Sequence, residues 1–193
     1  MKSLNRALSA GALIVAVGLA RTTASAQQRP SVADAVHKGH AVGHERDGVK
    51  AVRAALFAGG DVNQIDASGW TPLMHACLEC RGNIVELLLE HGANVSLRAS
   101  STASSFMSHG QSALNIAASC FIARRRAELA PERGMPETYA QTELAAPEKI
   151  VRKLIRAGAN VNGADADGET SLMMAVMQSW VGVVRELLAA GPS

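Results

Sequence analysis

Three histidines near the start of the chain have the spacing of a metal-binding cluster. His37, His40 and His44 stand at positions i, i+3 and i+7, so a helix over this segment would place all three imidazoles on one face. Such a group can bind zinc or copper. Gly39 and Gly43 weaken a helix here, and the alternative is a solvated polar insertion. The sequence leaves both interpretations open.

Two of the three cysteines, Cys77 and Cys80, have the Cys-x-x-Cys spacing of redox sites. Thioredoxin-type pairs lie at the start of a helix that follows a strand, where the helix dipole makes the thiol more acidic. This pair lies at the end of a predicted helix, which argues against redox catalysis. The sequence also has no Ser–His–Asp arrangement, no phosphate-binding loop and no paired carboxylates in an apolar setting. It therefore predicts a protein that is not an enzyme and uses no cofactor.

The elements around these residues are short helix pairs, most clearly over residues 66–95. Thr71 can cap a helix with its hydroxyl, and Pro72 suits the first helical position, which needs no backbone N–H. Apolar residues then recur at helical spacing in two segments, and Gly92 supplies the left-handed end of the second. Isolated helices of this length are marginal in water. The unit must therefore pack against neighbours.

Equivalent units recur at a fixed period. The glycines that end the second helices lie 33, 66 and 33 residues apart, at Gly59, Gly92, Gly158 and Gly191. Thr-Pro-Leu opens a first helix at 71–73, and Gly-Ala-Asn-Val follows the second helices at 92–95 and 158–161. A 33-residue period with these motifs resembles the ankyrin repeat.

The resemblance implies an all-α solenoid of about four helix–turn–helix repeats joined by β-hairpin-like loops. The repeats are expected at about 31–65, 66–98, 107–164 and 165–193, in one domain over 27–193. Met74 stands where ankyrin repeats favour histidine, and none of the repeats has the threonine–histidine hydrogen bond typical of the family.

Insertions are predicted between the helices of repeats one and three, the larger at 122–146. In repeat three, residues 120–130 are expected to extend the first helix, and 137–146 to form a short helix of their own. Pro147 is expected to start the second helix of the repeat. The three arginines at 124–126 are interpreted as a solvated helix face.

The resemblance also bears on the cysteines. Cys77 takes a core alanine position and is expected to be buried. Cys80 and Cys120 align within one position of each other in adjacent repeats. Stacked repeats lie about 10 Å apart, farther than the Cα atoms of a disulfide, so a bridge requires a local backbone shift. In an oxidising compartment, Cys80 and Cys120 are the candidate pair for a disulfide.

Residues 1–26 have the features of a cleaved secretory signal peptide. Lys2 and Arg6 give a positive start, residues 7–20 are apolar, and Ala24-Ser25-Ala26 fits a signal-peptidase site. This apolar run is shorter than the roughly 20 residues that a membrane-spanning helix needs. We therefore expect a periplasmic or secreted protein with no membrane association after cleavage, and an uncleaved tether is the alternative.

Removal of the signal peptide changes the net charge. It carries three of the 19 basic residues and no acidic one, so 16 basic residues remain against 17 acidic residues, a net charge of −1. No basic patch remains that would favour nucleic acid.

Ankyrin repeats choose partners through variable side chains, so the resemblance implies a non-enzymatic adaptor or scaffold that binds another protein. The variable positions at the hairpin tips and first-helix ends are Trp70, Leu78, Glu79, Gln111, Ser119, Glu169, Met177 and Gln178, with His37 and Lys38 at the edge. The alternatives are an inhibitor or immunity-type partner of an exported enzyme, and a metal-binding protein that uses the histidine cluster. The second helix of repeat four is as apolar as an internal one, so self-association through the C-terminal repeat is a further expectation.

Overall fold

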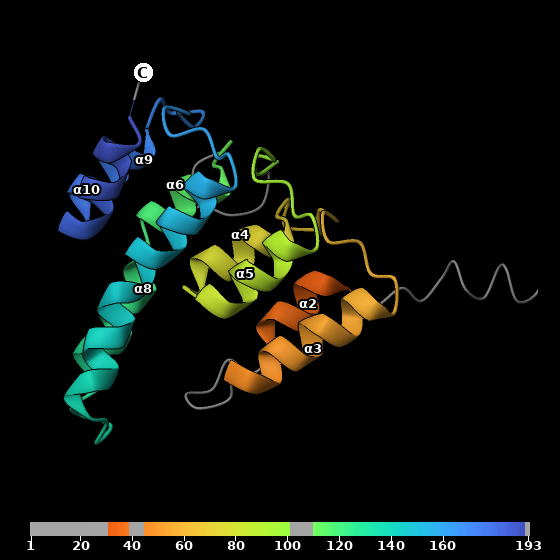
Figure 1. Cartoon of the computed structure of the whole chain (residues 1–193), viewed down its shortest axis with the longest axis horizontal. Coiled ribbons are helices and arrows are strands. Elements are labelled where there is room, and N and C mark those ends of the chain that lie inside the picture. Colours follow the sequence, from red (N-terminus) through yellow and green to blue (C-terminus); the bar gives the residue numbers. More distant parts are fainter. Residues whose placement is uncertain (1–30, 39–44, 101–109, 192–193) are drawn as a thin grey trace, which may run out of the picture.

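The computed structural model describes residues 31–38, 45–100 and 110–191 and shows helix pairs stacked along one axis (Figure 1). In each pair a short first helix packs against a longer second helix. The pairs are α2 (Val32–His37) with α3 (Glu45–Phe57), α4 (Pro72–Leu78) with α5 (Gly82–Glu90), α6 (Ala113–Ala118) with α8 (Glu137–Arg156), and α9 (Ser171–Met177) with α10 (Val181–Ala189). The predicted all-α solenoid of four repeats is confirmed.

The same kind of cap starts every first helix. The hydroxyls of Ser31, Thr71, Ser112 and Thr170 each accept a hydrogen bond from the N–H three residues later, at 3.1–3.3 Å. In repeat three the bond is reciprocal, because the Ser112 N–H also donates to Asn115 Oδ1 at 3.2 Å. Asn115 thus makes a contact with the cap residue from the position where the family favours histidine.

The core runs through the whole stack and is built from the facing sides of the helix pairs. Leu73, Ile84, Leu114 and Ile150 are at most 1% exposed. Burial of such a side chain contributes about 1.5–3 kcal/mol relative to its exposed state, so stacking, more than helix propensity, holds these short helices. Cys77 is buried as predicted, and burial raises the pKa of its thiol.

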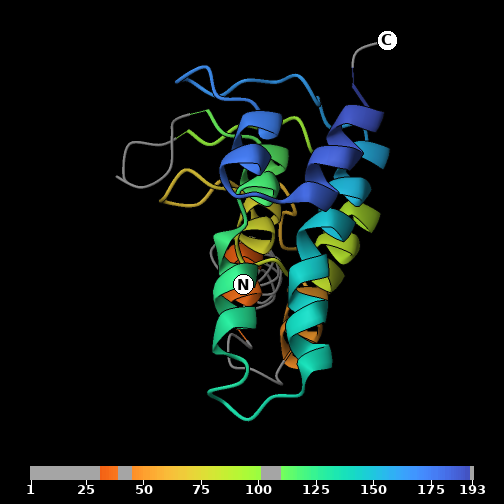
Figure 2. The ribbon, with the colours of Figure 1, turned by 90° about the vertical axis from the view of Figure 1, so that its left-hand side faces the viewer.

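The insertion in repeat three differs from the expectation. The chain breaks after α6, and α7 (Phe121–Leu129) is a separate helix. α8 then runs from Glu137 to Arg156 without a stop, with Pro147 inside it. The predicted boundary at Pro147 is therefore wrong. Packing of α8 against α7, α6 and α10 outweighs the one backbone hydrogen bond that proline removes. Figure 2 shows α7 and the first half of α8 side by side, projecting beyond the stack.

Loops with isolated antiparallel bridges connect the later repeats. Arg98 pairs with Ser112 before repeat three, and Ala164 pairs with Thr170 before repeat four. These are the β-hairpin-like connections that the resemblance implies. None of the helices in the described ranges is both long enough and apolar enough to cross a membrane.

Candidate protein-interaction surface

The loop that precedes α4 is held by one carboxylate, Asp66. Its Oδ1 accepts hydrogen bonds from the Ser68 N–H (2.9 Å), the Ser68 hydroxyl (2.6 Å) and the Trp70 N–H (3.0 Å). Its Oδ2 lies 2.7 Å from Nε2 of His75. Burial opposes ionisation, but the hydrogen bonds outweigh it and lower the pKa of the Asp66 carboxyl to about 2. The tip of this loop is therefore fixed by an ionised side chain at neutral pH.

Repeat four has an equivalent aspartate, Asp165, with two contacts instead of four. Oδ1 of Asp165 accepts hydrogen bonds from the N–H groups of Asp167 (3.0 Å) and Glu169 (2.9 Å). Met174 stands at the position that His75 holds in repeat two. Oδ2 of Asp165 is buried and has no hydrogen-bond partner within the described part of the chain. The two tips share a backbone geometry, but only the first has its carboxylate fully satisfied.

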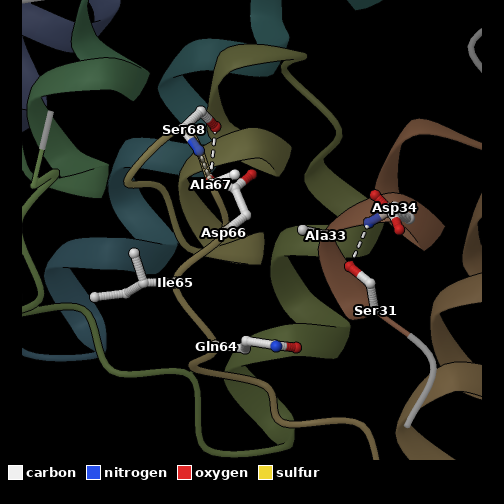
Figure 3. Close-up of a pocket in the computed structure, with 8 residues that line it drawn as sticks. All are labelled: Ser31, Ala33, Asp34, Gln64, Ile65, Asp66, Ala67 and Ser68. Atoms are coloured by element: carbon white, nitrogen blue, oxygen red, sulfur yellow. Dashed lines mark hydrogen bonds between the residues drawn. The ribbon is translucent and has the colours of Figure 1, made fainter. Parts of the chain in front are cut away.

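A pocket of about 500 Å³ lies between the first tip and the start of α2 (Figure 3). Ser31, Ala33 and Asp34 line it on the α2 side, and the loop 64–68 lines it on the other. Ile65 is 46% exposed, and Asp34 is exposed as well. The pocket therefore offers a partner the apolar side chain of Ile65 and the carboxylate of Asp34.

Three of the predicted contact residues are buried. Trp70, Glu79 and Gln111 are only 3–4% exposed, so their side chains cannot reach a partner and their predicted role is corrected. Trp70 packs beside the ring of His75, with 5.4 Å between the ring centroids. Of the remaining predicted contact residues, some are partly exposed (Leu78, Ser119, Glu169 and Gln178) and some are exposed (His37, Lys38 and Met177). For these, partner binding stays a prediction.

Glu79 is buried because it joins repeats one and two. Its Oε1 lies 2.7 Å from Nδ1 of His37, and its Oε2 lies 3.5 Å from Nη1 of Arg81. The same Arg81 nitrogen donates a hydrogen bond to the carbonyl of Val36 at 2.6 Å. The His37 ring also meets the His75 ring edge-on, with 4.7 Å between centroids. His37 therefore has a structural contact that is independent of any metal.

The other two members of the predicted metal cluster, His40 and His44, lie outside the described residues. Within the described ranges, no group of three histidine, cysteine, aspartate or glutamate side chains is placed to hold a metal ion. Metal binding by His37, His40 and His44 stays a prediction.

α7 ties together the two repeats on either side of its own. Arg126 donates a hydrogen bond to the carbonyl of Glu79 at 2.9 Å, and Arg124 donates one to the carbonyl of Gln178. Arg124 also lies over the Trp180 ring, 4.9 Å from its centroid. Glu79 and Gln178 hold the same position, directly after the first helix of repeats two and four. The interpretation of these arginines as a solvated face is therefore wrong for two of the three.

A disulfide joins Cys80 to Cys120, with 6.5 Å between the Cα atoms. Cys80 lies in the turn after α4, and Cys120 lies in the break between α6 and α7. That break brings the backbone of repeat three closer to repeat two at this point than regular stacking would.

Ion pairs connect the second helices of neighbouring repeats. Nζ of Lys153 on α8 lies 2.6 Å from Oε2 of Glu86 on α5, and Nη2 of Arg152 on α8 lies 2.7 Å from Oε1 of Glu186 on α10. Arg152 is also 2.8 Å from Glu148 within α8. The hydrogen bond from Arg152 lowers the pKa of Glu186. Glu86, Glu148 and Glu186 are thus neutralised by basic side chains of the second helices.

The geometry defines a helical-repeat scaffold that presents loop tips, and comparison with known proteins agrees. Residues 40–127, a little under half of the chain, match the family model of ankyrin repeats in three copies. The chain therefore contains ankyrin repeats, and its fold is an all-α ankyrin-repeat solenoid. Ankyrin repeats point to a protein–protein interaction module and are generally not enzymes.

A curated relative shares part of the array. The chain is similar to the human (Homo sapiens) 2-5A-dependent ribonuclease, with 42% identity over 64 residues. The match covers 33% of this chain and 9% of that protein. The chain therefore spans less than a tenth of the relative's length, and the ribonuclease activity named for that protein does not transfer to it.

The two tip carboxylates, Asp66 and Asp165, were not predicted from the sequence. Asp-Ala-x-Gly-x-Thr occurs at 66–71 and again at 165–170, one motif ahead of a first helix each time. That repetition, together with the tendency of aspartate to accept hydrogen bonds from nearby backbone N–H groups, is the signal that could have identified Asp66 and Asp165.

Proposed function

We propose that this protein is an exported adaptor that binds another protein through its loop tips. We call these residues the tip surface: Asp34, Gln64, Ile65 and Ala67 around the pocket, with Asp167 and Glu169 at the tip of repeat four. Export is supported by the signal-peptide features of residues 1–26, which lie outside the described residues.

The fixed geometry of the first tip carries the proposal. Asp66 holds the loop 64–70 in place through four hydrogen-bonding contacts, while Gln64, Ile65 and Ala67 remain exposed on it. A loop that is already ordered loses little conformational entropy on binding, so contacts made by such side chains translate more fully into affinity. In a recognition surface, we expect polar side chains to hold the loop in place and a neighbouring apolar side chain to remain exposed to solvent.

The charge distribution also favours the tip surface as the binding site. Asp34, Asp167 and Glu169 form no ion pair with any residue that the structure describes. On the second helices, by contrast, Glu86 and Glu186 are paired with basic residues of adjacent repeats. The tip surface therefore retains negative charge that a partner with basic side chains would complement.

A pair of matched substitutions tests the tip surface. Ile65→Ser removes the exposed apolar side chain beside the pocket, and Phe57→Ser removes one that is 96% exposed at the end of α3 and does not line the pocket. Purified protein with each change is cross-linked in an extract of the source cells, and captured proteins are compared by mass spectrometry. We expect Ile65→Ser to lose partners that Phe57→Ser retains. Equal capture by both variants would rule out the tip surface.

Trp70→Ala is a poor alternative test because Trp70 is buried, and its loss would disturb the fold. The export proposal has a separate readout. The intact mass of protein recovered from the periplasm shows whether the chain begins after Ala26, and recovery of the uncleaved chain from the membrane fraction would contradict it.

A further inference from the structure

α3 exposes a straight row of three basic side chains that ends in an aromatic one. Arg46, Lys50, Arg53 and Phe57 follow one another at intervals of four, three and four residues along the helix. At about 100° per residue these positions fall within an arc of about 60°, so they share one face of α3. All four side chains are exposed, and Phe57 is 96% exposed. Arginine and aromatic residues are enriched where proteins bind one another.

The positive charge of this row is not neutralised within the array. Arg46 and Arg53 form no ion pair with any residue that the structure describes. Lys50 lies 4.0 Å from Asp47, but the two side chains are 79% and 60% exposed. An ion pair so open to solvent contributes little. The row therefore keeps its charge available to a partner.

The register of the later repeats explains why Arg53 has no counterpart. Arg53 holds the position of Glu86, which pairs with Lys153 in the following repeat. In repeat two the position of Lys153 is taken by Leu87, which is apolar and buried. Repeat two is in place on this side, since α3 packs against α5 (Figure 1). Another repeat of the same array is therefore not the occupant of the row.

We propose that this row binds an acidic helix of a partner protein. We call Arg46, Lys50, Arg53 and Phe57 the α3 row. Intervals of three and four residues are the spacing of a seam along which two helices pack. A helix that lies along α3 presents carboxylates to the three cations at matching intervals and an apolar side chain to Phe57. The ion pairs set the register between the two helices, and the contact of Phe57 adds apolar area.

Other anionic partners match fewer features of the α3 row. A lipid surface attracts basic side chains but does not depend on their spacing. A nucleic-acid backbone supplies phosphates but no apolar side chain for Phe57. Regular spacing combined with one apolar end favours a helix. The α3 row shares no residue with the tip surface, so this proposal goes beyond the adaptor function and does not depend on it.

Two synthetic peptides test the proposal. Each is an alanine-based helix of about 20 residues, a length that allows it to be helical by itself. In the first peptide, glutamates recur at intervals of four and three residues along one face, which ends in two leucines. In the second, the same residues are spread around the helix. We expect fluorescence anisotropy to show saturable binding of the first peptide by the protein, and an affinity about tenfold lower or less for the second.

Substitutions in the α3 row make the test specific. Arg53→Glu and Phe57→Ser should each lower the affinity for the first peptide by about tenfold, whereas Ile65→Ser on the tip surface should leave it unchanged. A variant with Arg46→Glu, Lys50→Glu and Arg53→Glu together should lose the first peptide and bind its counterpart with lysine in place of glutamate. That gain shows that the variant is folded and that the charges of the row determine the partner.

Several results would overturn the proposal: no binding of the first peptide, equal binding of both peptides, or an affinity that Arg53→Glu leaves unchanged. Vesicles of phosphatidylcholine with about 30% phosphatidylglycerol test the lipid surface. If the wild-type chain sediments with them at about 0.15 M salt and the charge-reversed variant does not, the row binds a membrane and the proposal is wrong. These measurements do not involve the tip surface, so failure here leaves the adaptor proposal standing.

Discussion

Asparagine at Asp66 and at Asp165 should have opposite consequences, although the two residues occupy the same position in their repeats. Asp66→Asn removes a charge that both carboxylate oxygens use, with three donors on Oδ1 and His75 on Oδ2. Asp165→Asn keeps an oxygen for its two backbone donors and removes a charge whose second oxygen is buried without a partner in the described structure.

The pKa of Asp66 sets the size of the first effect. A fall from 3.8 to about 2 corresponds to about 2.4 kcal/mol at about 1.4 kcal/mol per pKa unit. The side chain is 26% exposed, and solvent screening reduces this value, so we expect Asp66→Asn to lower the free energy of unfolding by about 1–2 kcal/mol. For Asp165→Asn we expect a change within about 0.5 kcal/mol of zero, or a small gain, because the loss of an uncompensated buried charge offsets weaker hydrogen bonds.

The contribution of Asp66 to the free energy of unfolding should decrease as the pH falls. Its folded pKa lies below the unfolded one, so its contribution is complete above about pH 4 and is lost as the pH falls from there through 2. The difference in the free energy of unfolding between the wild-type chain and Asp66→Asn should therefore become smaller over that pH range.

Urea unfolding at pH 7 and at a series of acidic pH values, with linear extrapolation, measures both effects. Other carboxyl groups titrate in the wild-type chain and the variants alike, so the comparison isolates Asp66. Equal losses of unfolding free energy for Asp66→Asn and Asp165→Asn at pH 7 would refute the reasoning. A difference in unfolding free energy between the wild-type chain and Asp66→Asn that stays constant down to pH 2 would refute it as well.

Two further predictions concern neighbouring features. Met174→His should give Oδ2 of Asp165 the imidazole partner that its counterpart has in repeat two, raising the free energy of unfolding by about 1 kcal/mol; urea unfolding should show no such gain when Asp165→Asn is also present. Cys120→Ser should remove the disulfide to Cys80, which spans 40 residues, and lower the free energy of unfolding by up to about 4 kcal/mol. A reducing agent should lower the urea midpoint of the wild-type chain to that of the variant. A wild-type midpoint that is the same with and without the reducing agent would mean that Cys80 and Cys120 are free thiols.

Local chemistry allowed most of the fold to be predicted. Helix starts follow from hydroxyl caps such as Thr71, and helix ends follow from glycines with left-handed backbone such as Gly92, whose φ is 83°. Both depend on residues within one turn of each other. The period of these signals then gives the number of repeats.

What could not be predicted depends on tertiary packing. Pro147 is a helix breaker by itself, and only packing of α8 against four other helices makes it an internal residue. Trp70 was a candidate contact residue because its position is variable in the family, but it is only 4% exposed and packs beside the His75 ring. The tip carboxylates belong to a third case, since their motif is visible in the sequence but its role is clear only once the donors are placed.

Arg124 and Arg126 of α7 affect how this solenoid unfolds. In a simple array each repeat contacts only its neighbours, so unfolding can proceed one repeat at a time. Here Arg126 and Arg124 connect α7 to the equivalent turns of repeats two and four, and the disulfide adds a covalent link on one side. Repeats two to four are thereby coupled into one cooperative unit. Repeat one is joined to this unit through the contact of His37 with Glu79 and by helix packing, so we expect it to be the first part of the described array to open.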